Sequence, residues 1–171
     1  MKKKFFALMM AMVMILSLAA CGGSDAKEET PSNNDSTATE APAEGTAFKL
    51  GGTGPLTGGA AIYGNAVKYG AEIAVEEINA MGGIQFDLKM EDDTHDAEKA
   101  VNAYNALKDW GMQISLGSVT SKPCEATAAE TYADRIFALT PSASATAVTE
   151  GKDNMFQMCF MDPNQGSASA Q

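Results

Sequence analysis

The chain has 171 residues, with 22 acidic and 12 basic side chains and a formal net charge of −10. An acidic surface repels phosphate backbones, and no basic patch interrupts this one, so the composition argues against nucleic acid as a partner. Three of the basic residues lie at positions 2–4. Removal of an N-terminal leader would therefore make the chain more acidic still.

The N-terminal segment has the pattern of a bacterial export signal. Lys2, Lys3 and Lys4 precede an uncharged apolar run over 5–18, shorter than the roughly 20 residues that cross a bilayer. The run closes with Leu-Ala-Ala-Cys, which resembles the lipobox, where a diacylglycerol is attached to the cysteine. We predict a lipoprotein signal peptide over 1–20 and a lipid on Cys21 that holds the chain on the outer face of the cell membrane. An ordinary secretory signal with an incidental cysteine is the alternative.

The next segment, 21–47, contains the lipidated cysteine and then Gly, Ser, Thr, Asn, Pro, Ala and acidic residues without an apolar face. This composition predicts a disordered tether. From residue 48 onward the pattern is globular, and the remaining 48–171 suffice for one domain of ordinary size.

In this globular part, short apolar runs alternate with amphipathic stretches. Strands are predicted over 48–52, 84–90, 112–116, 136–139 and 154–160, and a helix over 123–132. A first helix follows the apolar positions Val67, Ala71, Ala74, Val75 and Ile78 and ends at 79–83. Another is capped by Asp96 and has the apolar stripe Ala97, Ala100, Val101, Tyr104 and Leu107. The alternation predicts an α/β fold with a doubly wound parallel sheet flanked by helices.

Ligands of such sheets bind at the carboxyl ends of the strands, near the point where the strand order reverses. Three loops fall there, 53–59, 117–121 and 140–144, and all are rich in hydroxyls and glycine. None contains a convincing catalytic base, and neither the spacing of a dinucleotide-binding loop nor a phosphate-binding G-K-[ST] is present. The pattern predicts a binding protein for a small polar molecule, with no enzymatic activity and no cofactor.

The chain has a single histidine, His95, which lies among Glu91, Asp92, Asp93 and Asp96. A solvated acidic turn is the favoured interpretation, a cation site the weaker one. Cys124 and Cys159 either form a disulfide or are two buried thiols. Cys159 lies in a strand-like run that would bury it. No spacing indicates a metal site.

From residue 48 to the end, the chain resembles the branched-chain amino-acid-binding proteins of ABC transporters, which have a periplasmic-binding-protein-like type I fold. The matching segments, in family order, are Gly54-Pro55-Leu56-Thr57-Gly58, Tyr63-Gly64, Gly70-Ala71-Glu72, 74–79 with 82–84, 91–93, 140–143 and 162–166. Members have two lobes that close over a ligand. The resemblance implies that residues 48–171 form the first lobe, that the second is absent, and that the helix leading to it begins where the sequence stops.

The resemblance also implies site residues. Ser121 would hold the ligand α-carboxylate through its hydroxyl and amide. The Ser142 carbonyl and the Ser144 hydroxyl would receive the α-ammonium, and Tyr63 would lie beside the ligand. Thr120, the residue before Ser121, is also expected to bind the ligand. The alternative for the serines is capping and turn formation.

His95 and Thr120 fall where some members have a cysteine pair, so that disulfide is missing here. The implied ligand is an amino acid, by default leucine, isoleucine or valine, and the implied partner is an ABC permease. A sensory receptor with the same fold is the alternative function, and an extracellular hydrolase would need a base that the sequence lacks.

Overall fold

The structure is a computed structural model that describes residues 47–171. The predicted signal peptide, the lipidation site Cys21 and nearly all of the predicted tether therefore lie outside the described residues. Within 47–171, none of the helices has both the length and the apolar character needed to cross a membrane.

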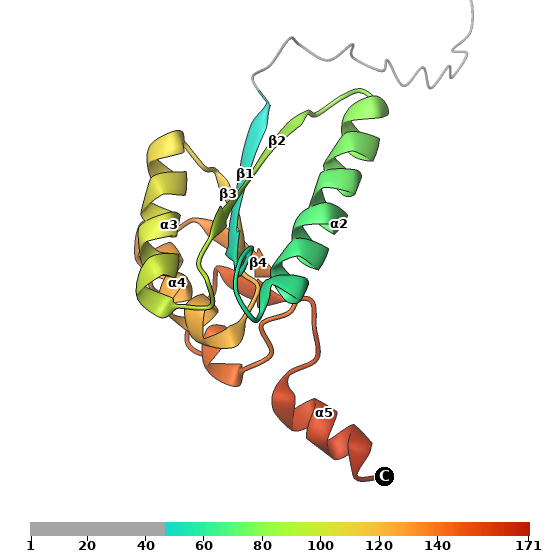
Figure 1. Cartoon of the computed structure of the whole chain (residues 1–171), viewed down its shortest axis with the longest axis vertical. Helices are drawn as coiled ribbons and strands as arrows, with labels where there is room; N and C mark the ends of the chain where they lie inside the picture. Colours follow the sequence, from blue (N-terminus) through green and yellow to red (C-terminus); the bar gives the residue numbers. More distant parts are fainter. Residues whose placement is uncertain (1–46) are drawn as a thin grey trace, which may run out of the picture. The chain divides into compact units, whose positions relative to one another are not determined.

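The described residues form five strands and five helical segments (Figure 1). The strands are β1 (Phe48–Gly54), β2 (Phe86–Asp92), β3 (Ile114–Ser118), β4 (Phe137–Thr140) and β5 (Met155–Gln157). The helices are α2 (Ala61–Ala80), α3 (Ala97–Trp110), α4 (Ser121–Asp134), the 3₁₀ turn η1 (Thr146–Val148) and α5 (Asp162–Ser169).

The strands form one parallel sheet in the order β2-β1-β3-β4-β5. The chain leaves β1 toward β2 and then returns past β1 to β3, so the strand order reverses between β1 and β3. Helix α2 covers one face of the sheet and helices α3 and α4 the other (Figure 1). The predicted doubly wound α/β fold is confirmed.

The predicted elements are present, with differences at their ends. The predicted fifth strand, 154–160, is too long, because β5 ends at Gln157. Cys159 therefore lies beyond the strand and is only half-buried. A helix also begins earlier than expected, at Asp162, with a proline in its first turn, where the missing N–H of proline removes no helical hydrogen bond.

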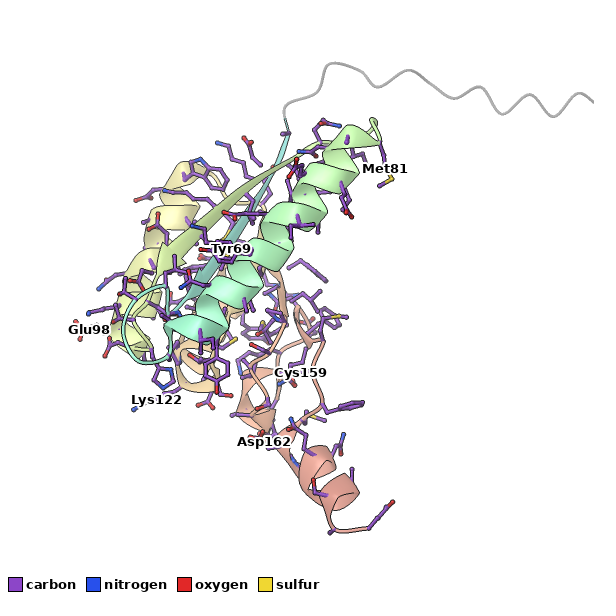
Figure 2. The ribbon with its side chains drawn as sticks, turned by 45° about the vertical axis from the view of Figure 1, so that its right-hand side comes forward. Tyr69, Met81, Glu98, Lys122, Cys159 and Asp162 are labelled. Atoms are coloured by element: carbon purple, nitrogen blue, oxygen red, sulfur yellow. The ribbon has the colours of Figure 1, made fainter. Side chains whose placement is uncertain are left out.

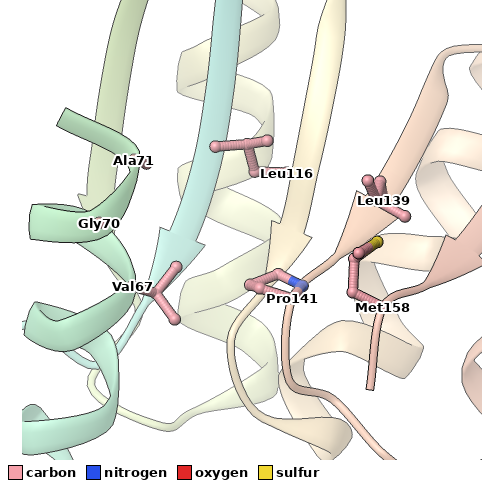
Figure 3. A pocket seen from close by; sticks show the side chains of 7 residues that line it. All are labelled: Val67, Gly70, Ala71, Leu116, Leu139, Pro141 and Met158. Carbon is pink, nitrogen blue, oxygen red and sulfur yellow. The ribbon is translucent and has the colours of Figure 1, made fainter. Parts of the chain in front are cut away.

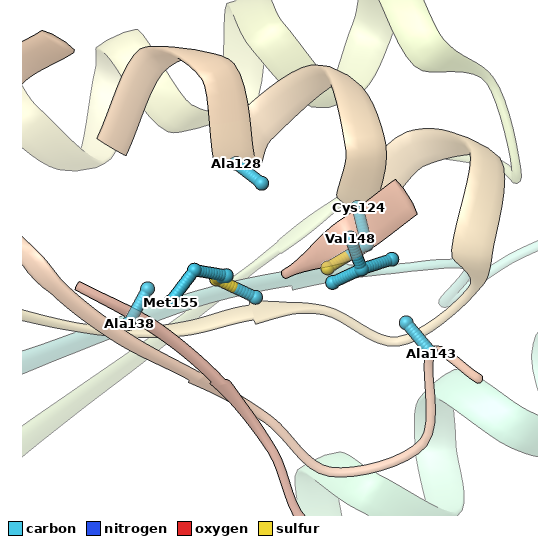
Figure 4. Packing of buried hydrophobic residues seen from close by; sticks show 6 residues of the cluster. All are labelled: Cys124, Ala128, Ala138, Ala143, Val148 and Met155. Carbon is cyan, nitrogen blue, oxygen red and sulfur yellow. The ribbon is translucent and has the colours of Figure 1, made fainter. Parts of the chain in front are cut away.

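The face under α3 and α4 is closed by buried side chains. Asp96 caps α3 by accepting from the Lys99 amide at 2.9 Å, and the predicted stripe buries Ala100, Tyr104 and Leu107. A second cluster lies between α4, β4, β5 and η1 (Figure 4). Its members are Cys124, Ala128, Ala138, Ala143, Val148 and Met155.

Helix α2 packs less completely on the opposite face. Gly64 is its only buried residue, and a Cβ there would lie 2.0 Å from the Pro55 carbonyl oxygen, so the start of α2 approaches the loop after β1 as only glycine permits. Of the predicted apolar side, Ala74 and Ile78 are exposed, which corrects the prediction. Tyr69 and Ile73 are each 57% exposed (Figure 2 shows Tyr69).

Between α2 and the strands β3 and β4 lies an apolar groove of about 320 Å³ (Figure 3). Its walls are Val67, Gly70, Ala71, Leu116, Leu139, Pro141 and Met158. The two faces of the sheet are therefore covered unequally.

Candidate functional site

A second hollow, of about 530 Å³, lies at the carboxyl ends of the strands, where the strand order reverses. It is lined by Tyr63, His95, Val119, Thr120, Ser121, Lys122, Ser142 and Ser144. These residues come from the start of α2, the loop between β2 and α3, the loop after β3, the start of α4 and the loop after β4. The structure thus brings together all five residues that the sequence pointed to as ligand-binding: Tyr63, Thr120, Ser121, Ser142 and Ser144.

An irregularity in β3 precedes the central loop of this hollow. The pairing of β1 with β3 shifts by one residue opposite Gly117, which has φ +62°. Directly after it, the Ser118 hydroxyl lies buried between the hydroxyls of Thr53, at 2.5 Å, and Thr127, at 3.0 Å. Ser118 is thereby turned into the protein, and the loop that follows reaches the hollow.

The Ser121 hydroxyl accepts hydrogen bonds from the amides of Ser144 and Ala145, at 3.1 and 3.3 Å. Both lone pairs of the oxygen are then in use, while its hydrogen is left to donate. Ser121 is also the first residue of α4, where backbone amides lack a helical acceptor and favour an anion. The hydroxyl and the helix start together present donors to a negatively charged group.

The loop after β4 is tied to the loop after β3 by side chains. The Ser142 hydroxyl donates to the Val119 carbonyl at 2.6 Å, and the Thr140 hydroxyl donates to the Ser118 carbonyl at 2.8 Å. The Ser142 hydroxyl is therefore engaged within the protein. These bonds fix the relative positions of Ser121, Ser142 and Ser144.

His95 lines the same hollow. The interpretation of its surroundings as a solvated acidic turn gave it no place in the site. Its Nδ1 lies 2.9 Å from the Thr120 hydroxyl, so the two residues that stand in place of the family's cysteine pair are in direct contact. Thr120 caps no amide of α4 with its side chain. The signal that could have found His95 is its position directly after a strand that neighbours the central one.

Two adjacent acids at this edge of the sheet have pKa values that are shifted in opposite directions. Burial tends to raise the pKa of Asp92, but hydrogen bonds from the Thr57 hydroxyl and from the Thr94, Leu56 and Thr57 amides outweigh it, so the pKa lies below its ordinary value. Burial raises the pKa of Asp93, and hydrogen bonds from the His95 amide and the Thr53 hydroxyl only partly oppose it. Within 47–171, no group of three His, Cys, Asp or Glu residues is arranged to hold a metal ion.

Both described cysteines are free thiols. Cys124 is fully buried, and the Cys159 thiol donates to the Ala143 carbonyl at 3.4 Å. Burial raises the pKa of both thiols, which keeps them protonated and weakly reactive.

Residues 47–171 match the sequence model of a family described as "Periplasmic binding protein". The chain is 33% identical over 126 residues to the Leu/Ile/Val-binding protein BraC3 of Rhizobium johnstonii, a match that covers 71% of this chain and 34% of that protein. The chain thus spans about a third of the length of the curated relatives it matches. These relatives are solute-binding proteins and not enzymes.

Two solved structures have the same fold. One is the branched-chain amino acid transporter substrate-binding protein LivJ of Streptococcus pneumoniae in complex with isoleucine, at 29% identity and a TM-score of 0.64, covering 68% of this chain and 35% of that one. The other is the leucine-binding protein LivK of Thermotoga maritima, at 29% identity and a TM-score of 0.66, covering 72% and 36%.

Proposed function

The chain belongs to the periplasmic binding protein family, and on that premise we propose that it is the receptor of an ABC importer, which captures an amino acid outside the cell membrane and delivers it to a permease. In this proposal the hollow at the carboxyl ends of the strands is the ligand site. Ser121 holds the α-carboxylate, the Ser142 carbonyl and the Ser144 hydroxyl receive the α-ammonium, and Tyr63 and Thr120 lie beside the ligand.

The observation that carries the proposal is the state of the Ser121 hydroxyl. Two amides occupy its lone pairs, so it faces the hollow as a donor at the start of a helix. An α-carboxylate supplies the acceptor and the negative charge that this position favours. The names of the relatives make leucine, isoleucine and valine the first ligands to test.

The test is Ser121→Ala. Loss of one hydrogen bond to a charged group weakens binding by about 1.5–3 kcal/mol, or roughly 10- to 150-fold. The dissociation constant is measured by titration followed through backbone amide shifts, which report weak as well as tight binding. Ser167→Ala on α5 is the control, because Ser167 is exposed and does not line the hollow. An unchanged dissociation constant for every amino acid that the parent chain binds would remove Ser121 from the site.

We further propose that a second lobe completes the site. A single lobe leaves the ligand half exposed, and loss of even two charge-assisted hydrogen bonds costs upwards of roughly 3 kcal/mol. We therefore expect residues 48–171 alone to bind amino acids in the millimolar range. Micromolar binding by this lobe would contradict the two-lobe proposal.

The anchoring proposal rests on Cys21. Cys21→Ala should abolish incorporation of labelled fatty acid and leave the chain unprocessed or released from the membrane. A variant that is labelled and membrane-bound like its parent would show that Cys21 is not the anchor.

A further inference from the structure

Seven of the eight residues that line the proposed ligand site carry a polar side-chain group, and Val119 is the only aliphatic one. His95 and Lys122 are the two nitrogen-bearing side chains among them. No carboxylate lines the site. The groove beside α2 is lined almost wholly by apolar surface, whereas this hollow combines apolar surface with these polar groups.

His95 is fixed beside this hollow by an unusual backbone. Thr94 and His95 have φ +49° and +65°, a region that residues other than glycine seldom occupy. The Thr94 amide donates to Asp92 and the His95 amide to Asp93, both at 2.9 Å, and the Asp93 side chain is fully buried. The hydrogen bonds to the Asp92 and Asp93 carboxylates thus fix the turn, and the turn holds the imidazole at the edge of the hollow.

The contact between His95 and Thr120 occupies Nδ1 and leaves Nε2 as the ring nitrogen that can reach a ligand. When the Thr120 hydroxyl donates to Nδ1, the ring hydrogen is on Nε2, which is then a donor to the ligand, whereas donation from Nδ1–H to Thr120 makes Nε2 an acceptor. Lys122, from the first turn of α4, lines the same hollow and adds a positive charge beside it.

We propose that His95 sets the ligand class: the site takes an amino acid whose side chain ends in a carbonyl or carboxylate oxygen, and His95 Nε2–H donates to that oxygen. The inference rests on the proposed function, in which Ser121 binds the α-carboxylate. It places the preferred ligand among acidic and carboxamide amino acids. Aliphatic ones leave the His95 donor without an acceptor, a loss that weakens their binding.

The experiment uses the full chain as recovered from the cells that express it. It is titrated with leucine, glutamine and glutamate, which have similar sizes and differ in the end of the side chain. His95 is the only histidine in the chain, so its imidazole ¹⁵N signals are unambiguous. The amide signals of Ser121 and Ser144 report occupancy of the site, and the imidazole signals report contact with the ligand side chain.

We expect glutamine or glutamate to bind roughly 10-fold or more tightly than leucine, the effect of about one hydrogen bond. They should shift the imidazole signals, with Nε2 protonated, whereas leucine should shift only the serine amides. A preference for glutamate over glutamine identifies the carboxylate as the group recognised, and the reverse identifies the carboxamide.

His95→Phe keeps a ring and removes its donor, and it should lower the affinity for glutamine to that for leucine and reduce the preference for glutamate. Lys122→Ala should weaken glutamate binding, whereas Lys68→Ala, which removes the same charge from α2 outside the hollow, should not.

The outcomes separate the two proposals. If all three ligands bind equally, or if His95→Phe weakens them equally, Ser121 remains the carboxylate site and the role of His95 in selection is wrong. Tighter binding of leucine also overturns that role. If none of the ligands shifts the Ser121 and Ser144 amides, the proposed function itself fails, and the inference about His95 with it. Should His95→Phe not fold, the imidazole signals of the parent chain decide by themselves.

Discussion

The two faces of the sheet are built differently, although the same five strands form both. On the face of α3 and α4, Tyr104, Leu107 and Val148 are almost completely buried. On the face of α2, the groove remains open, and Met158 at its edge is 71% exposed. The start of α4, which contains Ser121, rests on the closed face, whereas Tyr63 comes from α2. We infer that the end of the proposed site that contains Ser121 is the rigid part, and that the position of Tyr63 depends on how α2 packs.

The sharpest test compares one leucine from each face. Leu107 is 1% exposed, so Leu107→Ala should lower the free energy of unfolding by about 2–5 kcal/mol. Leu139 is only half-buried in the groove, and Leu139→Ala should cost about 1 kcal/mol or less. Urea unfolding of both variants measures the difference. Equal losses would mean that the open face is as well packed as the closed one.

A second test concerns how α2 is attached. Gly64→Ala should destabilise the chain by about 1–3 kcal/mol, because the new methyl group would overlap the Pro55 carbonyl. Gly70→Ala in the same helix is the matched control. Its Cβ would meet nothing within 4 Å, and alanine should stabilise the helix by about 0.5–1 kcal/mol. If both variants gain stability in urea unfolding, α2 does not depend on close contact at Gly64.

A third test uses the two acids beside the site. Asp92 fastens the loop that leads to α2, and Asp93 connects through Thr53 and Ser118 to Thr127 on α4. The lowered pKa of Asp92 adds stability above the ordinary value of 3.8, and this is lost as the pH falls through the lowered pKa. The raised pKa of Asp93 has the opposite sign, because stability is lost as the pH rises from 3.8 through the raised pKa.

Asp92→Asn should therefore cost more at pH 7 than at pH 3, and Asp93→Asn should cost less at pH 7 than at pH 3. Urea unfolding of each variant and of the parent chain from pH 3 to pH 7 gives, for each substitution, the slope of its free-energy cost against pH. Slopes of the same sign would contradict the opposite pKa shifts of the two carboxyl groups.

The smallest effect on folding should come from the open face itself. Met158→Lys should change the free energy of unfolding by only about 0.5 kcal/mol, since the side chain is mostly exposed. It should nevertheless reduce self-association, because exposed apolar patches promote it. Sedimentation at increasing concentration measures this, with Asn105→Lys on the outer side of α3 as a control of equal charge. Identical sedimentation of the two variants would show that the groove takes no part in association.

The sequence predicted the alternation of strands and helices, because apolar runs or an apolar–polar alternation mark the strands and α3 has one apolar stripe. Helix α4 has no such stripe, since the residues that it buries include Thr127 and Thr131. The sequence predicted the buried side of α2 poorly, because the apolar residues of this helix go almost around it and do not single out one face. Ser121, Ser142 and Ser144 were identified through the family resemblance and not through a pattern of their own. His95 was missed as a wall residue, because its place depends on a left-handed turn and on a contact with Thr120, 25 residues away.

The position of β1 has a consequence for how the chain folds. β1 is the first strand of the described residues, yet it lies inside the sheet and pairs with both β2 and β3, with Leu50 opposite Ile114. β3, the second partner of β1, follows after α2 and α3. The central pairing of the sheet therefore cannot form until β3 has been made. Pairings between strands far apart in sequence slow folding. A delay of this kind suits a polypeptide that crosses a membrane unfolded, as the proposed export requires.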